Sequence, residues 1–305
     1  MVGVRLSLSA FLAHLSLTTA GFLACRRPAP SGTGSGTGEN GVLGRATLAE
    51  ALRLLGLRRG QIVLVHASLR SVGEIAGGVA TLYDALRDVL GRRGTLVVPA
   101  YTPGNSDTSK SFHRATRHMT PQEKEAYRDQ IPAFDPEKSS SIECGVLSEY
   151  VRTRRRAVRS GHPQTSFAAV GPAARGITAG HRHDNHLGER SPLRELERRG
   201  AMVLLLGVSY DRCTAFHLAE YRYTPKPPTA VYGCAMKVDG RRTWISYEDV
   251  VLDDSDFGEC GAAMELTEKV NLGRVGNADG RLFPLPAAVA FAQNWFAERR
   301  GRTGE

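Results

Sequence analysis

Apolar and polar residues follow two kinds of pattern from Thr47 onward. Residues 47–57 and 79–90 place apolar side chains at helical spacing, which predicts two amphipathic helices, the first with Thr47 as its N-cap. Residues 61–66 and 94–99 are short apolar runs without alternation, as is typical of strands covered on both faces. The order strand, loop, helix, strand predicts a βαβ unit with a parallel strand pair.

The rest of the chain continues this mixture of strands and helices. The segment 102–136 is polar and lacks a clear period, so we expect it to be a long excursion that covers a site. A hairpin is expected around Asp239 and Gly240, because an Asp-Gly pair suits a tight β-turn. The other predicted elements are strands at 166–170 and 201–207, helices at 144–152, 193–199, 214–221 and 286–300, and hairpin strands at 231–238 and 243–247.

The N-terminal segment differs from the rest of the chain. In residues 4–25, Arg5 precedes an apolar stretch that ends at Cys25 and looks like a weak secretory or lipoprotein signal. A start codon assigned too far upstream explains the segment equally well. The Pro/Ser/Gly/Thr linker that follows buries little apolar area, so residues 1–46 are expected to be disordered and the domain to span 47–300.

Composition places the body among ordinary globular proteins. Apolar residues make up 41% of the 305 residues and charged residues 23%, which excludes a disordered chain, a fibrous repeat and a disulfide scaffold. No later segment has eighteen consecutive apolar residues, so the folded body is expected not to span a membrane. The five cysteines form no C-x-x-C pair, which favours reduced thiols and a cytoplasmic location. The net charge of +9 favours anionic partners.

The loop after the first predicted strand has features of an anion site. Residues 66–73 are followed by Gly77 and Gly78 at the start of a helix, where free N–H groups and the positive end of the helix dipole meet. The loop lacks the GK[ST] ending of a Walker A motif and the G-x-G-x-x-G spacing of a dinucleotide site. An ordinary turn between strand and helix is the alternative.

A loop at 181–192 is rich in histidine. His181, His183 and His186 suggest a metal site, since clustered imidazoles bind zinc and related ions. The same residues also suit a polar loop that leads into a helix capped by Ser191. No spacing in the loop defines a metal geometry, so we expect no metal.

Two further segments carry candidate chemistry. Residues 211–220 follow the most hydrophobic strand, where α/β proteins place ligand sites. His217 and Glu220 lie one helical turn apart, so His217 is either a general base with a carboxylate partner or a buried histidine satisfied by a hydrogen bond. Residues 248–259 hold six carboxylates, which either attract a cationic substrate or form a solvated loop.

Together these segments resemble the aminoglycoside 3-N-acetyltransferase family, also called the antibiotic N-acetyltransferases. The stretches that carry the resemblance occur in the family's order: LVHASLRSVGEIAGGVATLYDAL, GTLVVPAYT, HPQTSFAAVGP, LGERSPLRELERRGAMVLLLGV and TAFHLAEYR. The resemblance implies an α/β fold with a mixed, mostly parallel sheet flanked by helices, distinct from GCN5-type acetyltransferases. It also implies acetyl transfer from acetyl-CoA to an amine. Because a histidine with a carboxylate supplies the base and the leaving thiolate needs no metal, we expect direct transfer.

The resemblance also implies roles for individual residues. His217 occupies the position of the family's catalytic histidine, and the stretch WISYED points to Glu248 as its carboxylate, with Asp249 and Asp253 as alternatives and Glu220 beside it. The implied coenzyme A contacts are Ser68, Leu69, Ser71, Val72 and Gly73, with Thr102, Ser166 and Phe167 along the same channel, and the implied substrate contacts are Asp211, Asp249 and Asp253. We further infer that arginines in 152–159 meet the nucleotide phosphates.

The sequence leaves the acceptor amine open. Aminoglycosides are polycations and suit the carboxylates of 248–259, whereas the net charge of +9 opposes them, as does Arg190, which stands where the family commonly has glycine. Another amine is therefore the alternative acceptor. Two other function classes are weaker: an exported metal-dependent hydrolase that uses the histidine loop, and nucleic-acid binding by the arginine run, which lacks interleaved aromatic residues. A monomer and a homodimer both fit the sequence.

Overall fold

The computed structural model describes residues 41–301, so the signal-like segment and most of the linker lie outside the described residues. Inside them, the ordered fold begins earlier than predicted. Leu43 is buried, and its backbone exchanges hydrogen bonds with Glu74 and Ala76. Residues 41–46, predicted to be disordered, therefore belong to the folded body.

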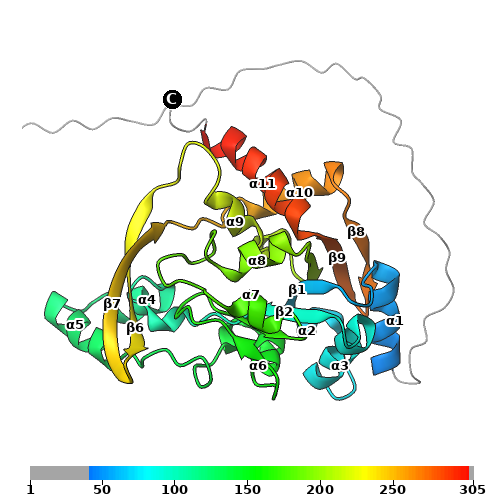
Figure 1. The fold of residues 1–305 in the computed structure, drawn as a ribbon, viewed down its shortest axis with the longest axis horizontal. Helices are drawn as coiled ribbons and strands as arrows, with labels where there is room; N and C mark the ends of the chain where they lie inside the picture. The colour runs from blue at the N-terminus through cyan, green and yellow to red at the C-terminus, as the bar shows by residue number, and fades with distance from the viewer. Residues whose placement is uncertain (1–40, 302–305) are drawn as a thin grey trace, which may run out of the picture. The chain divides into compact units, whose positions relative to one another are not determined.

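Within residues 41–301, seven strands form one sheet in the order β3-β4-β2-β1-β5-β9-β8 (Figure 1). Their bounds are β1 Ile62–Ala67, β2 Thr95–Pro99, β3 Val158–Arg159, β4 Phe167–Val170, β5 Met202–Leu206, β8 Asn271–Val275 and β9 Ala278–Pro284. The predicted βαβ unit is confirmed, because β1 pairs in parallel with β2. The prediction of a mixed α/β sheet is also confirmed.

The balance of strand directions differs from the prediction. Strand β1 is parallel to both β2 and β5, but the other four neighbouring pairs in the described sheet are antiparallel. The sheet is thus not mostly parallel: parallel pairing is confined to its three central strands. The outer strands join by direct antiparallel connections, as between β8 and β9, where no crossover helix intervenes.

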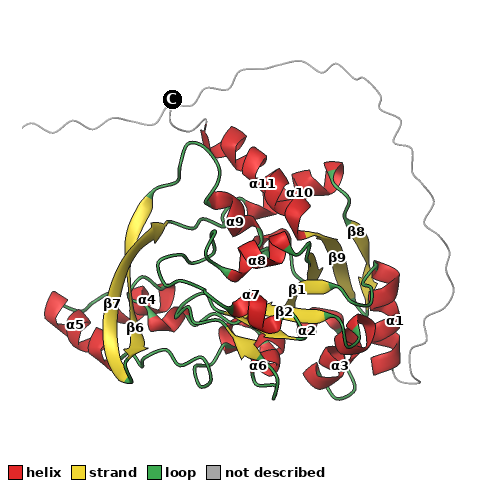
Figure 2. Cartoon of the chain, viewed as in Figure 1, coloured by secondary structure: helices red, strands yellow, loops and turns green. Residues whose placement is uncertain are grey.

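Helices cover both faces of the sheet (Figure 2). Successive residues of β5 point to opposite sides, with Val203 and Leu205 in one apolar core and Leu204 and Leu206 in the other. This explains the unalternating apolar strand in the sequence. The helices are α1 Arg45–Leu55, α2 Leu69–Val72, α3 Val79–Leu90, α4 Lys110–Thr116, α5 Pro121–Gln130, α6 Val146–Arg152, α7 Ala174–Thr178, α8 Pro192–Arg198, α9 Phe216–Glu220, α10 Phe257–Thr267 and α11 Leu285–Arg300. No helix among them has the length and apolar composition needed to cross a bilayer.

The predicted hairpin is confirmed and stands apart from the main sheet. Strands β6 Thr229–Val238 and β7 Arg241–Val250 pair around Asp239 and Gly240, which both adopt positive φ. The excursion 102–136, which contains α4 and α5, packs against this hairpin through Phe112 and Ile131 (Figure 1). It contributes no residue to the main cavity described below, so the prediction that it covers the site is wrong for that cavity.

Two predicted helix starts are wrong, and three strands, β3, β8 and β9, were not predicted. Helix α1 begins at Arg45 after Gly44, so Thr47 lies inside the helix rather than at its N-cap. Helix α9 begins one residue after Ala215, which replaces the predicted cap Thr214. Strands β8 and β9 escaped prediction because each mixes polar with apolar residues and has a glycine in its interior; a Cβ on Gly280 would lie 2.8 Å from the Leu55 side chain of α1.

Candidate functional site

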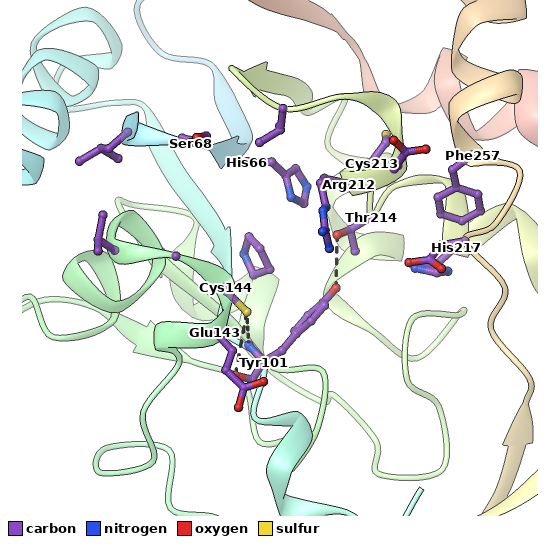
Figure 3. A pocket seen from close by; sticks show the side chains of 18 of the residues that line it. His66, Ser68, Tyr101, Glu143, Cys144, Arg212, Cys213, Thr214, His217 and Phe257 are labelled. Atoms are coloured by element: carbon purple, nitrogen blue, oxygen red, sulfur yellow. Dashed lines mark hydrogen bonds between the residues drawn. The ribbon is translucent and has the colours of Figure 1, made fainter. Parts of the chain in front are cut away.

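A cavity of about 570 Å³ opens at the carboxyl ends of the parallel strands β1, β2 and β5 (Figure 3). This edge is where the loops of an α/β sheet commonly hold ligands. The residues that line the cavity are His66, Ala67, Ser68, Leu69, Arg70, Pro99, Tyr101, Glu143, Cys144, Gly145, Val146, Val208, Asp211, Arg212, Cys213, Thr214, His217, Asp254 and Phe257. Of the predicted site residues, Ser68, Leu69, Asp211 and His217 are among them.

His217 is held by a buried carboxylate on its own short helix. Its Nδ1 lies 2.6 Å from Oε2 of Glu220, whose side chain has no exposed surface. The other carboxylate oxygen of Glu220 accepts hydrogen bonds from Arg300 Nη1 at 2.7 Å and from the backbone N–H of Asp253 at 2.9 Å. Because a carboxylate only accepts, Nδ1 of His217 carries the proton. Nε2 of His217 is therefore left as the basic nitrogen.

Arg300 holds this arrangement together from the end of α11. Besides Glu220 it binds Asp256 through two nitrogens, at 2.9 and 2.5 Å, and its guanidinium lies 4.0 Å from the centroid of Phe296. Burial lowers the pKa of Arg300, but the hydrogen bonds and charges of Asp256 and Glu220 raise this pKa by more than burial lowers it. The net shift is therefore upward. Glu220 is consequently paired with a permanent cation.

The structure does not bring Glu248 to His217. Glu248 is exposed on β7, and its carboxylate accepts a hydrogen bond from the hydroxyl of Thr229 on β6. Asp253 meets the site through its backbone, while its side chain is exposed and accepts from Ser255. The carboxylate that contacts the histidine is therefore Glu220.

Asp249 lies in a second polar cluster, not in the cavity. Its Oδ2 accepts from Nδ1 and from the backbone N–H of His186, both at 2.6 Å, and from the Tyr221 hydroxyl at 2.9 Å. Burial raises the pKa of Asp249, but the hydrogen bonds and charge of His186 outweigh burial and lower it overall. Asp249 therefore fastens the histidine loop to β7 and leaves no carboxylate oxygen directed at the cavity.

The histidine loop is stabilised by internal hydrogen bonds. His181 bonds to the hydroxyl of Ser160 and to the carbonyl of His186, and His162 accepts from the N–H of Gln164 while its Nε2 donates to the carbonyl of His183. No group of three His, Cys, Asp or Glu side chains among the described residues is arranged to hold a metal ion. Both ring nitrogens of His181 and of His186 are engaged by protein groups, and His183 is exposed.

The buried histidines predict acid-sensitive stability. Burial first, and neighbouring histidines second, lower the pKa of His162, and burial lowers that of His181 to about 4. An unfolded histidine has a pKa near 6.5, so below that pH the unfolded chain takes up protons that the folded chain refuses. We expect the free energy of unfolding to have its full value above pH 6.5. Below that pH it should fall by about 1.4 kcal/mol per pH unit for each of these histidines, down to pH 4.

Urea unfolding at pH 7.5, 6 and 5 measures this slope. Replacing His181 by asparagine should remove one proton from the difference between the unfolded and folded chains. The slope should then be smaller than that of the wild type by about 1.4 kcal/mol per pH unit. Replacing the exposed His118 by glutamine is the matched control and should leave it unchanged. A stability that is flat between pH 7.5 and 5 would contradict the prediction.

The predicted coenzyme A loop divides between two pockets. Ser68 and Leu69 line the cavity, whereas Ser71 lines a neighbouring pocket of about 310 Å³, and Val208 borders both. The Ser68 hydroxyl caps α2 by accepting from Ser71. Val72 is buried, and Gly73 has φ +101, where a Cβ would lie 2.8 Å from the Asn277 amide. Val72 and Gly73 thus shape the loop rather than line the cavity.

The residues predicted to line the far channel are held inside the protein. Ser166 and Phe167 are fully buried at the start of β4, and Thr102 accepts a hydrogen bond from Arg159. Arg159 also donates to Ser166 at 2.9 Å and to the carbonyl of Ala100, and burial lowers its pKa to about 10. Arg152 pairs with Glu149. These two arginines of the run therefore have protein partners in place of the inferred phosphates.

The cavity contains groups that sequence analysis did not assign. His66 belongs to the predicted anion loop, but no role was predicted for it. The signal that could have identified it is a histidine at the end of a predicted apolar strand. Cys144 lies in the cavity wall, where its Sγ accepts from the backbone N–H of Tyr101 at 3.1 Å, and burial raises the pKa of its thiol to about 11. Arg212 points into the same space (Figure 3). Only the tertiary fold brings these groups to His217.

Comparison with known proteins identifies the family. The family model described as aminoglycoside 3-N-acetyltransferase matches residues 64–297. The aminoglycoside N(3)-acetyltransferase VII of Streptomyces paromomycinus is 37% identical over 278 residues, which cover 86% of this chain and 94% of that protein. The aminoglycoside N(3')-acetyltransferase-like protein YokD of Bacillus subtilis is 36% identical over 254 residues, which cover 83% and 92%.

Solved structures agree with this assignment. The crystal structure of YokD from Bacillus subtilis superposes with a TM-score of 0.81 at 34% identity, covering 86% of this chain and 96% of that one. A complex described as AAC-IIIb binary with CoASH superposes with a TM-score of 0.75 at 30% identity, covering 85% and 97%. The chain therefore belongs to the aminoglycoside 3-N-acetyltransferase family and is an acyltransferase.

Proposed function

We propose that the protein transfers the acetyl group of acetyl-CoA directly to an amine of an aminoglycoside, at the 3-N position, with His217 as the general base. The observation that carries the proposal is the contact between His217 and the buried Glu220 at the edge of the cavity. An ammonium group cannot attack a thioester until it loses a proton. Nε2 of His217 is placed to accept that proton, and Glu220 stabilises the imidazolium that forms.

Family membership supports acetyl-CoA as the donor. The loop of Ser68 and Leu69 lies at the mouth of the cavity and in the sheet position where α/β proteins bind phosphate-bearing ligands. A relative of similar fold binds coenzyme A. We expect the pantetheine arm to run along this loop and to place the thioester between β1 and α9.

Direct transfer is favoured over an acetyl-enzyme. Among the described residues, the cysteines that line the cavity are Cys144 and Cys213. Burial raises the pKa of these thiols to about 11 and about 12, so neither is a thiolate at neutral pH. The amine can instead attack the thioester in a ternary complex, where positioning supplies much of the rate.

The cavity charges support a cationic acceptor. Among its lining residues, Glu143, Asp211 and Asp254 are acidic and exposed, against Arg70 and Arg212. An aminoglycoside amine next to the one that reacts would meet these carboxylates. The acidic side chains outnumber these two arginines by only one, so an amine with fewer positive charges is the alternative acceptor.

Thiol release from acetyl-CoA tests the proposal. We expect release that depends on an added aminoglycoside, and a product heavier by one acetyl group on the 3-amine, as read by mass spectrometry and NMR. A Cys144→Ala variant should turn over at the wild-type rate. Release with simple amines alone would redirect the acceptor assignment, and no release with any amine would overturn the proposed function.

A further inference from the structure

Four histidines are buried among the described residues: His66, His162, His181 and His186. In three of them both ring nitrogens have hydrogen-bond partners in the protein. His66 is the exception: its Nε2 is buried and has no partner within the described part of the chain. A buried polar atom without a partner costs about 1–3 kcal/mol, so its retention calls for a physical reason.

The position of His66 supplies that reason. It is only 8% exposed, and its ring forms part of the cavity wall at the end of β1. The next residues along the chain, Ala67, Ser68 and Leu69, form the loop proposed to hold coenzyme A. Figure 3 shows His66 and His217 on the same cavity, carried by β1 and α9. A thioester that lies along the loop would reach the space between the two imidazoles.

The two imidazoles have different surroundings. His217 has a carboxylate partner, which suits a group that gains a proton during the reaction. His66 has none, and burial first, then its neighbours His217 and Arg212, lower its pKa to about 3. At neutral pH the ring of His66 is therefore uncharged, with one N–H donor and one acceptor nitrogen. Such a ring cannot act as a strong acid, but its N–H can polarise a carbonyl, as a neutral histidine does in other enzymes.

We propose that His66 donates a hydrogen bond to the carbonyl oxygen of the acetyl thioester and stabilises the oxyanion that forms there. The proposal rests on the proposed acetyl transfer and adds a second catalytic residue to it. The amine nitrogen forms a bond to the thioester carbon, and the π electrons of C=O move to the oxygen beside His66. The amine proton passes to Nε2 of His217. The C–S bond then breaks, the C=O bond re-forms, and the departing thiolate receives the proton from His217.

A purely structural role for His66 is less consistent with its surroundings. The cores that flank β1 are built from apolar side chains such as Leu64 and Val65. A histidine in that wall without a protein partner stabilises nothing that a leucine would not. The ring of His66 gains a hydrogen-bond partner only when a ligand oxygen fills the cavity. Because this donor is already in place, it needs no reorganisation during the reaction.

Steady-state kinetics of two variants test the proposal. His66→Leu removes the donor, and we expect kcat to fall by about 10²–10³-fold while the KM for acetyl-CoA changes by less than about threefold. His66→Gln keeps an N–H donor of similar reach, so it should recover part of the loss. Because His66 stays neutral, the pH profile of His66→Gln should match that of the wild type. Wild-type kcat in His66→Leu, or a change in KM alone, would overturn the proposal.

Infrared spectra of bound [1-¹³C]acetyl-CoA provide a second readout that does not depend on turnover. The thioester carbonyl stretch should move to lower frequency when the wild type binds, because a hydrogen bond weakens C=O, and the shift should disappear in His66→Leu. An equal shift in both proteins, or no shift in the wild type, would overturn the role of His66. Failure of the proposed function shows differently, as absence of thiol release by the wild type with every amine.

Discussion

Replacement of His217 by glutamine is expected to lower kcat by about 10²–10⁴-fold, the range that general-base catalysis contributes. The glutamine side chain still fills the site beside Glu220 but cannot accept the proton of the attacking amine. The residual activity should rise with pH, because without the base only amine that is already deprotonated can attack the thioester. Steady-state thiol release across pH 6 to 9, with acetyl-CoA binding measured by calorimetry, checks both statements.

The matched control for His217 is His113, which is exposed on α4 and outside the cavity. His113→Gln should keep wild-type kinetics. Glu220→Gln should give a smaller loss than His217→Gln, because it removes the charge that stabilises the imidazolium but leaves the base in place. If His217→Gln retained kcat within about threefold of the wild type, His217 would not be the base.

Replacement of Arg300 by alanine is expected to lower the free energy of unfolding by about 3–5 kcal/mol, because it removes the arginine charge that compensates the buried carboxylate of Glu220. Glu220 has no exposed side-chain surface, and Arg300 is the cation that contacts it, at 2.7 Å. Urea denaturation at pH 7.5 measures the change. Arg299→Ala, on the exposed neighbouring residue, is the matched control and should cost much less.

The double variant Arg300→Ala with Glu220→Gln separates charge from packing. If the cost comes from the unpaired carboxylate, the double variant should be more stable than Arg300→Ala alone. Losses that simply add would show that Arg300 acts through its other contacts, with Asp256 and the ring of Phe296. A loss below about 1 kcal/mol in Arg300→Ala would contradict the buried-pair argument.

Local sequence signals predicted most of the secondary structure near the site. Helix α3 was predicted with its observed ends, and β1, β2 and β5 within one residue at each end, because their apolar patterns are uninterrupted and glycine or proline marks most of their boundaries. The hairpin was predicted because the Asp-Gly pair is a local signal for a tight β-turn. Strands β8 and β9 lacked such a signal, since each mixes polar with apolar residues and has a glycine where the Leu55 side chain approaches the backbone.

The candidate site was predicted only where its contacts are local. His217 and Glu220 are three residues apart on one helix, so the spacing alone places them on the same helix face. The choice between Glu220 and Glu248 could not be made in this way. Glu248 lies on a hairpin whose pairing turns it towards Thr229 and solvent, while the adjacent Asp249 turns inward to His186. Side chains of successive strand residues point to opposite faces, so a shift of one residue reverses the assignment.

The sequence by itself determined the family, the central βαβ unit and the one-turn spacing of His217 and Glu220, because each is read from short stretches of the chain; that Glu220 and not Glu248 contacts His217 came from the tertiary structure. Only the tertiary structure decided that Arg300 neutralises Glu220, that Asp249 anchors His186, and that His66 lies in the wall of the same cavity as His217. The first two contacts join residues 80 and 63 positions apart. Periodicity predicts which face of a helix or strand is buried. It does not predict which distant segment covers that face, because this depends on how the whole chain packs.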